Sequence, residues 1–167
     1  PGENVSPKAE DIRKGEKILS KDTFIRYQEM GLIASAGYDS VEVYRKPKIK
    51  LIITGNELVE PTKEEIDKAK IINSNKYAIK AMIEDAGALV SISHAGDTFD
   101  EVREEVLKAT KDYDVIMTTG GTAISKGDVV LDVVDDLGEV LFHGVAIRPG
   151  KPFGAGVIND KMIFTFS

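Results

Sequence analysis

A loop rich in glycine and hydroxyl side chains follows the apolar run Val115–Met117 and leads into a predicted helix that begins at Val129. Glycine lets backbone N–H groups approach a phosphate, and the N-terminus of the helix adds further N–H donors. Serine and threonine hydroxyls can donate additional hydrogen bonds to such an anion. The residues that we expect to take part are Thr118, Thr119, Gly120, Gly121, Thr122 and Ser125. The sequence therefore predicts an anion-binding loop.

Asp128 ends this loop, at a position where its negative charge would repel an anion. One interpretation is that its carboxylate caps the following helix, as aspartate commonly does. The other is that it holds a divalent cation that bridges the protein and a bound phosphate. The residue types alone leave both interpretations open.

Two further acids follow predicted strands. Glu57 comes soon after the apolar run Leu51–Ile53. Asp97 comes after the strand predicted at Ala88–Ile92. Ligands of open α/β sheets bind at the carboxyl ends of the strands, so we expect these acids and Asp128 to converge on one edge. Three carboxylates there would suit Mg²⁺ together with a phosphate or oxyanion. Asp97 also has a simpler interpretation, because an acid just before a helix favours the helix dipole.

The rigid turn Arg148–Pro152 is the other segment that resembles a site. Its two prolines and its glycine fix the backbone and hold Lys151 between them. A fixed lysine suits a phosphate or an oxyanion, but a solvated turn lysine is an equal alternative, and Arg148 has the same two interpretations. His94 and His143 each come at the end of a predicted strand. Neither has a second histidine or a cysteine at ligand spacing, so we leave both outside the predicted site.

The composition limits the classes of function. The chain has 167 residues, of which 42% are hydrophobic and 30% are charged, as expected for a soluble globular domain with a small appendage. A net charge of −6 without a Lys/Arg-rich block argues against a nucleic-acid partner. No apolar run is long enough for a membrane role, and the absence of cysteine excludes disulfides, thiolate metal sites and thiol nucleophiles. We expect a cytoplasmic protein and a chain cut from a longer one.

Strands alternate with helices after Pro47, and this alternation predicts a mostly parallel sheet with helices on both faces, a three-layer α/β fold. The predicted helices span residues 23–36, 75–86, 98–111 and 129–137. The predicted strands span residues 41–44, 51–53, 88–92, 115–117, 139–143, 153–158 and 161–166. Thr98 and Glu101 form a capping-box pair that fixes the start of the third helix. We therefore expect an α/β domain at 47–167 and, at 1–46, a small α+β extension from a neighbouring domain.

Four motifs stand in a fixed order along the chain. They are Thr54–Leu58, Ser74–Asn75, Thr119–Thr122 with Asp128 beyond it, and Arg148–Phe153. Together they resemble the molybdopterin molybdotransferase family, which includes MoeA and the E domain of gephyrin. Residues 2–37 also resemble the segment that leads into the central domain of this family, so the resemblance covers the whole chain. It implies a MogA-like molybdopterin-binding fold, with the family's C-terminal domain absent from this chain.

The resemblance implies an enzyme of molybdenum cofactor biosynthesis that takes adenylylated molybdopterin with Mg²⁺, inserts molybdate and releases AMP. A molybdopterin adenylyltransferase is the implied pathway partner, and the family is homodimeric, with a site completed by the N-terminal domain of the other subunit. The implied catalytic residues are Glu57, Asp97, Asp128 and Lys151, and the three acids are also the implied metal ligands. The residues implied to bind the pterin substrate are Thr54, Gly55, Ser74, Asn75, Gly120, Gly121, Thr122, Ser125, Pro149, Gly150 and Pro152. Asp11 matches a further functional acid of the family.

The chain departs from the family's pattern at several positions. In the loop, Ala123, Ser125 and Lys126 stand where the family usually has serine, glycine and glutamate. A hydroxyl and an acid are therefore lost, and a positive charge is gained. Asn56 and Asn73 stand where aspartate is commoner.

Two other classes of function remain open. The related adenylyltransferases share the central fold, but their loop usually reads Gly-Gly-Thr-Gly with an Arg-Asp pair, unlike Ala123 and Lys126–Asp128 here. A non-catalytic module is the second alternative, because the gephyrin branch uses this fold as a scaffold for receptor peptides. ATP turnover, a peptide groove and molybdate-dependent loss of adenylylated pterin are the observations that distinguish the three functions.

Overall fold

The computed structural model describes residues 4–62, 71–120 and 128–166. It divides into two compact units, Pro1–Tyr44 and Arg45–Ser167. Every strand of the described structure belongs to the second unit, which also contains all the described helices except α1. Within the described residues, no helix is both long enough and apolar enough to cross a membrane.

The first unit contains helix α1 (Tyr27–Ser35) and otherwise consists of turns and irregular segments in its described residues. The helix begins after residue 23 because Ser20–Thr23 forms a turn, and because the Glu29 carboxylate accepts a hydrogen bond from the backbone N–H of Arg26 at 2.9 Å. Gly37 follows the end of the helix in the left-handed conformation (φ 86°) that is typical of a glycine after a helix.

The predicted strand at residues 41–44 is wrong. These residues have no regular secondary structure, and Val41, Val43 and Tyr44 are exposed. Alternating apolar residues form a strand only when a neighbouring strand satisfies their backbone groups, and no described strand pairs with this segment. The Tyr44 hydroxyl donates instead to the Asp22 carboxylate at 2.8 Å. The extension thus contributes a helix, and no strand, in the residues that the structure describes.

The second unit is built on a six-stranded sheet in the order β4-β1-β5-β8-β7-β6. The strands are β1 (Lys48–Thr54), β4 (Leu89–Ala95), β5 (Val115–Thr119), β6 (Glu139–His143), β7 (Gly154–Ile158) and β8 (Lys161–Phe166). Strands β4, β1, β5 and β8 run parallel, whereas β7 is antiparallel to both β8 and β6. All strands except β7 therefore end at the same side of the sheet, which we call the carboxyl edge.

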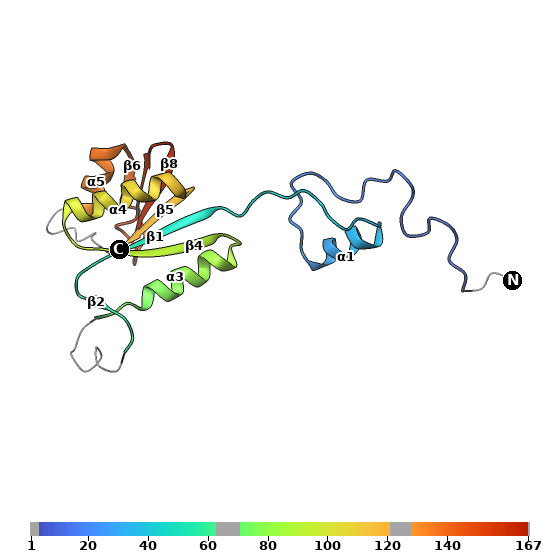
Figure 1. Cartoon of the computed structure of the whole chain (residues 1–167), viewed down its shortest axis with the longest axis horizontal. Helices are drawn as coiled ribbons and strands as arrows, with labels where there is room; N and C mark the ends of the chain where they lie inside the picture. Colours follow the sequence, from blue (N-terminus) through green and yellow to red (C-terminus); the bar gives the residue numbers. More distant parts are fainter. Residues whose placement is uncertain (1–3, 63–70, 121–127, 167) are drawn as a thin grey trace. The chain divides into compact units, whose positions relative to one another are not determined.

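Helix α3 (Ser74–Asp85) covers one face of the sheet, and α4 (Phe99–Asp112) and α5 (Val129–Leu137) cover the other (Figure 1). The larger core lies under α4 and α5, where helix and strand side chains pack together: Ile52, Val102, Val106, Ile116, Val130, Val133, Val134, Ile158 and Ile163. A smaller core, Ile49, Ile83 and Ala88, lies under α3. The predicted three-layer α/β fold with a mostly parallel sheet is confirmed.

The helix starts of the second unit are set by polar caps. At α4 the Thr98 hydroxyl accepts from the backbone N–H of Glu101 at 3.4 Å, and the Glu101 carboxylate accepts from the backbone N–H of Thr98 at 3.3 Å, which confirms the capping box. One feature of this unit was not predicted. The short strands β2 (Leu58–Val59) and β3 (Ile71–Ile72) form a separate parallel pair between β1 and α3.

Candidate functional site

The ends of β1, β5 and β8 are held together at the carboxyl edge. The Thr54 hydroxyl donates to the carbonyl of Thr119 at 3.3 Å, and the backbone N–H of Gly120 donates to the carbonyl of Phe166 at 3.2 Å. Gly120 has a positive φ of 86°, and a Cβ at this position would collide with the Thr54 carbonyl. Only glycine allows so close an approach. The start of the glycine loop is therefore fixed against the end of β1.

The remainder of this loop, with the predicted ligands Gly121, Thr122 and Ser125, lies outside the described residues. Of the two threonines that precede the loop, Thr118 is fully buried, so its hydroxyl cannot reach a ligand at the surface. Thr119 is also buried. Phosphate binding by the loop stays a prediction that rests, among the described residues, on Gly120 and on the N-terminus of α5.

Asp128 is the N-cap of α5 and is only 8% exposed. Its Oδ1 accepts a hydrogen bond from the backbone N–H of Leu131 at 3.0 Å. Its Oδ2 is buried without a hydrogen-bond partner and lies 3.4 Å from Nε2 of His143, the last residue of β6. Burial raises the pKa of the Asp128 carboxyl, while the Leu131 N–H and the nearby His143 act in the opposite direction. This geometry supports the capping interpretation of Asp128.

Glu57 and Asp97 are exposed, just beyond the ends of β1 and β4. The Asp97 carboxylate accepts a hydrogen bond from the backbone N–H of Asn56 at 3.1 Å, which ties the two loops together. The Glu57 side chain folds back over Gly55, since a Cβ at Gly55 would lie 3.0 Å from both carboxylate oxygens of Glu57. Gly55 also has a positive φ of 131°, which favours glycine. The two exposed acids thus belong to one connected pair of loops.

The expected sharing of one cation by all three acids stays a prediction. Within the described residues, no three His, Cys, Asp or Glu side chains come close enough to hold a metal ion together. Two of the three carboxylates have a local partner. Asp128 is turned toward the first turn of α5 and His143, whereas Asp97 is bonded to the loop after β1.

Ser74 and Asn75 are exposed in the first turn of α3. Asn73 precedes them as the N-cap, is only 3% exposed, and accepts a hydrogen bond from the backbone N–H of Lys76 at 3.2 Å. The first backbone N–H groups of a helix have no partner within the helix. The exposed start of α3 therefore offers donors to an anion near the end of β1.

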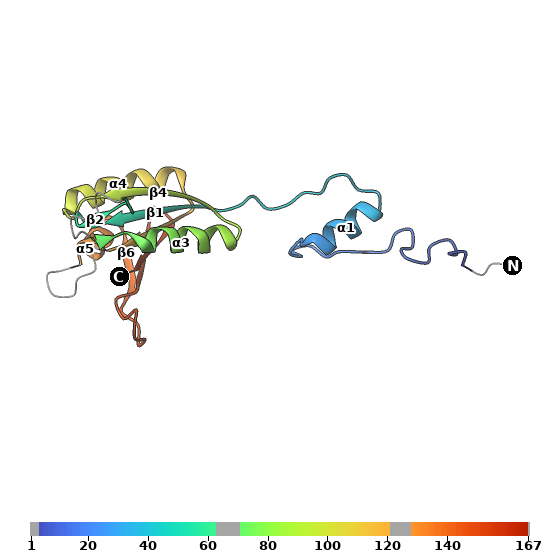
Figure 2. The same ribbon diagram turned by 90° about the horizontal axis from the view of Figure 1, so that it is seen from below.

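The turn that carries Lys151 extends the β6–β7 hairpin away from the sheet (Figure 2). A hydrogen bond from the backbone N–H of Val145 to the carbonyl of Lys151, at 3.0 Å, continues the hairpin ladder into this turn. The Arg148–Pro149 peptide is cis, and Gly150 has a positive φ of 102°. Lys151 is exposed, and Pro152 is half-buried. The lysine is therefore carried by a constrained turn and faces solvent.

Both histidines lie beside carboxylates, although their sequence spacing gave no sign of it. His143 lies against Asp128, and Nε2 of His94 lies 3.8 Å from Oε1 of Glu60. Glu60 was not predicted as a site residue either. Each histidine lies at or next to the end of a strand at the carboxyl edge. That position, rather than ligand spacing, is the signal that would have identified them.

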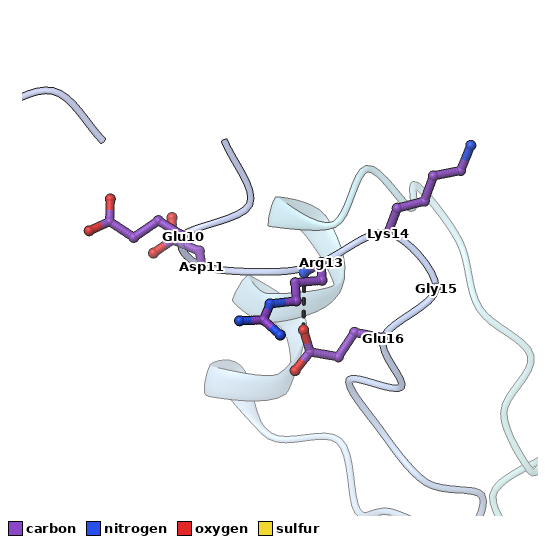
Figure 3. Close-up of a pocket in the computed structure, with 6 residues that line it drawn as sticks. All are labelled: Glu10, Asp11, Arg13, Lys14, Gly15 and Glu16. Carbon is purple, nitrogen blue, oxygen red and sulfur yellow. Dashed lines mark hydrogen bonds between the residues drawn. The ribbon is translucent and has the colours of Figure 1, made fainter. Parts of the chain in front are cut away.

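Asp11 belongs to the first unit. It lines an open depression with neighbours of both charge signs: Glu10, Arg13, Lys14, Gly15 and Glu16 (Figure 3). The backbone N–H of Arg13 donates to the Glu16 carboxylate at 3.0 Å. The mixed charge gives this depression no preference for an anion or a cation.

The family described as "Probable molybdopterin binding domain" matches residues 50–167. The match includes most of β1, the glycine loop with Asp128, and the Lys151 turn. The chain belongs to this molybdopterin-binding family. The family resemblance read from the four motifs is thereby confirmed.

Relatives of this molybdopterin-binding chain extend beyond it. A Bacillus subtilis protein named molybdopterin molybdenumtransferase is 35% identical over 168 residues, which cover 99% of this chain and 39% of that protein. A Methanocaldococcus jannaschii protein named for molybdopterin biosynthesis is 37% identical over 175 residues, which cover 100% of this chain and 44% of that protein. The chain spans about two fifths of the length of these relatives.

Solved structures agree with this assignment. The crystal structure of a MoeA protein from Pyrococcus horikoshii has a TM-score of 0.73 at 33% identity, covering 92% of this chain and 36% of that chain. The crystal structure of molybdenum cofactor biosynthesis protein B has a TM-score of 0.53 at 18% identity, a likeness that concerns the fold alone.

Proposed function

We propose that this chain is the molybdopterin-binding part of a molybdopterin molybdotransferase, which inserts molybdate into adenylylated molybdopterin and releases AMP. The observation that supports it most is the close approach of Gly120 to Thr54 at the carboxyl edge, just before the N-terminus of α5. Backbone N–H groups in such a place suit a phosphate, and this place coincides with the family's glycine motif. Relatives named for this transferase activity match nearly the whole chain.

The roles of the residues follow from their places at the edge. The glycine loop binds the pterin phosphate, with Gly121, Thr122 and Ser125 as its donors, while Gly120, whose N–H is bound to the Phe166 carbonyl, sets the start of the loop. The neighbouring loop and helix start, with Gly55, Ser74 and Asn75, line the substrate, and the buried Thr54 holds the end of β1 against the glycine loop. Lys151 neutralises a substrate phosphate or the incoming oxyanion, and its turn is held in shape by Pro149, Gly150 and Pro152. Asp128 holds the start of α5 and with it the end of the loop.

Glu57 and Asp97, which are exposed, suit Mg²⁺ better than Asp128, which is buried. Glu57 and Asp97 stand on the two loops that the Asn56–Asp97 hydrogen bond connects, and their carboxylates are the oxygen donors that this cation prefers. Mg²⁺ usually takes only one or two protein carboxylates and keeps water and substrate phosphates as its other ligands. When bound, it would offset the negative charge of the phosphoanhydride and the molybdate.

The test is an assay of AMP release from adenylylated molybdopterin by a full-length protein that contains this chain, with and without molybdate. The proposal expects AMP release that depends on molybdate. AMP release that is independent of molybdate would overturn the proposal. Turnover of ATP would also overturn it and would indicate an adenylyltransferase.

We further propose a homodimer in the cytoplasm, supplied with substrate by an adenylyltransferase. Because the chain covers only part of its relatives, we expect the 167-residue chain to bind molybdopterin but to have little transferase activity. Titration with molybdopterin and a turnover assay of the same preparation measure both properties. Full activity of the 167-residue chain would show that the site does not need other domains or a second subunit.

A further inference from the structure

Four side chains from three segments meet near the carboxyl edge, and none of them has a role in the proposed function. The Glu60 carboxylate, just after β2, is bound through Oε1 to the ammonium of Lys76 and accepts a hydrogen bond at Oε2 from the Tyr77 hydroxyl at 2.5 Å. Nε2 of His94, on β4, lies 3.8 Å from Oε1 of the same carboxylate. One carboxylate is therefore bound by an ammonium and a phenol, and an imidazole lies nearby.

This group of residues stands next to the loops that are proposed to bind substrate. His94 pairs with Ile53 in the sheet, one residue before the end of β1. Lys76 and Tyr77 follow the exposed residues Ser74 and Asn75 in the first turns of α3. All three donors thus come from rigid elements at the carboxyl edge, while their acceptor comes from the segment between β1 and α3.

The burial of the partners is unequal. The Lys76 side chain is only 18% exposed, so its charge needs a permanent partner, whereas the Glu60 side chain is 44% exposed. Nδ2 of Asn73, at the start of the same helix, is buried without any hydrogen-bond partner. The ammonium of Lys76 is thus the partly desolvated member of the group, whereas the Tyr77 and His94 side chains, at 47% and 49% exposed, are as open to solvent as the carboxylate.

A fixed ammonium, hydroxyl and imidazole around one anionic group are the donors with which proteins bind phosphate and similar oxyanions. We infer that Lys76, Tyr77 and His94 form a second binding site for a tetrahedral oxyanion, and that the Glu60 carboxylate occupies it in the free protein. An incoming phosphate or molybdate displaces Glu60 and takes over its contacts with the three donors. This site goes beyond the proposed transferase function and does not depend on it.

The inference is tested by titrating the 167-residue chain with inorganic phosphate, followed by NMR shifts of the backbone amides of residues 73–77. In Glu60→Ala the internal competitor is gone, and phosphate should bind at least about tenfold more tightly than to the wild type. Glu84→Ala is the matched control, because Glu84 pairs with Lys80 on the exposed surface of the same helix at 2.8 Å. It removes one acid from α3 and should leave the affinity unchanged.

A double variant, Glu60→Ala with Lys76→Met, should lose the gain in affinity because the ammonium is the main anion ligand. A parallel titration with molybdate distinguishes two kinds of site. A site for a free oxyanion would bind molybdate at least as tightly as phosphate. A site for a phosphate group of the substrate would bind phosphate more tightly. Unchanged phosphate affinity in Glu60→Ala, with a wild-type melting curve, would overturn the inference and make Glu60 a structural clamp. If Glu60→Ala does not fold, Glu60→Gln removes the charge at nearly constant shape, and an unchanged phosphate affinity in that variant would equally overturn the inference.

Discussion

Asp128 and Asp97 both follow parallel strands of one sheet, yet they lie in opposite environments. Asp128 is 8% exposed, caps α5 and has His143 beside its second oxygen. Asp97 is exposed, and its carboxylate accepts only one backbone N–H, from the loop after β1, in the contacts that the described structure shows. The buried acid caps a helix and serves the fold, whereas the exposed acid keeps carboxylate oxygens available for a ligand.

The same contrast separates other residues of the carboxyl edge. Thr98 caps α4, and Gly120 lets the backbone just after β5 approach the Thr54 carbonyl closely. Substitutions at these two positions should therefore lower stability before they affect binding. Glu57 and Lys151 are exposed, so changes there should act first on binding. The predictions below test this division with stability and binding measured on the same variants.

Lys151→Ala should have the largest effect, and it should appear in binding alone. Loss of a charge-assisted hydrogen bond to a substrate anion costs about 1.5–3 kcal/mol, or roughly ten- to 150-fold in affinity. The free energy of unfolding should stay unchanged because the side chain is solvated. Titration with molybdopterin and urea denaturation measure the two quantities. Wild-type binding by this variant would make Lys151 a solvated turn residue.

Asp128→Ala should have the largest effect on stability. It removes the N-cap of α5 and should lower the free energy of unfolding by about 1–2 kcal/mol, as at other capping sites. Asp128→Asn is the matched control, because asparagine caps a helix about as well as aspartate. Urea denaturation of both variants measures the difference. Equal stability of the alanine and asparagine variants would show that the cap contributes little.

Thr98→Ala should cost about 1 kcal/mol, somewhat less than the loss of Asp128, because the cap of α4 is exposed to solvent. Thr98→Ser keeps the hydroxyl and should restore most of the stability. Neither change should alter molybdopterin affinity if Thr98 serves the fold alone. A loss of affinity that serine rescues would instead assign the hydroxyl a part in binding.

The sequence predicted well wherever local chemistry decides the structure. The capping box of α4 depends on residues three apart, and the apolar strands of a parallel sheet are continuous runs such as Leu51–Ile53. The strand at 41–44 failed because a strand also needs a partner, which no local pattern supplies. The pair β2–β3 was missed for a related reason, since two residues are too few for a periodic signal.

The candidate site was predicted in its parts but not in its arrangement. The glycine motif follows from residue type and order, whereas the cap at Asp128 is one of two interpretations that the sequence leaves open, and its bond to the Leu131 N–H supports it. The contacts of His143 with Asp128, and of His94 with Glu60, depend on which strands are neighbours in the sheet. The local hydrogen bonds of the Asp97 and Asp128 carboxylates also depend on the fold, and no pattern in the sequence indicated the bond between Asp97 and Asn56.

The pH dependence of stability gives a smaller effect that tests the burial of Asp128. Burial raises the pKa of this carboxyl in the folded protein above the unfolded value of about 3.9. Between these two values the folded state binds more protons, so the contribution of Asp128 to stability falls as the pH rises. Asparagine does not titrate. The wild type should therefore lose stability relative to Asp128→Asn from about pH 3 to pH 7, measured by urea denaturation. A relative gain with rising pH would contradict the burial.

Asp97→Asn should have the smallest effect on stability and the clearest effect on metal dependence. Asparagine keeps an oxygen that can accept the N–H of Asn56, so only the interaction of the charge with the dipole of α4 is lost, about 0.5 kcal/mol. A Mg²⁺ ligand, in contrast, needs the negative charge. In the full-length protein the variant should require much more Mg²⁺ for AMP release, while Asp128→Asn should keep the wild-type Mg²⁺ requirement. If instead Asp128→Asn requires much more Mg²⁺ and Asp97→Asn keeps the wild-type requirement, then Asp128 holds the cation, and Asp97 serves only the start of α4.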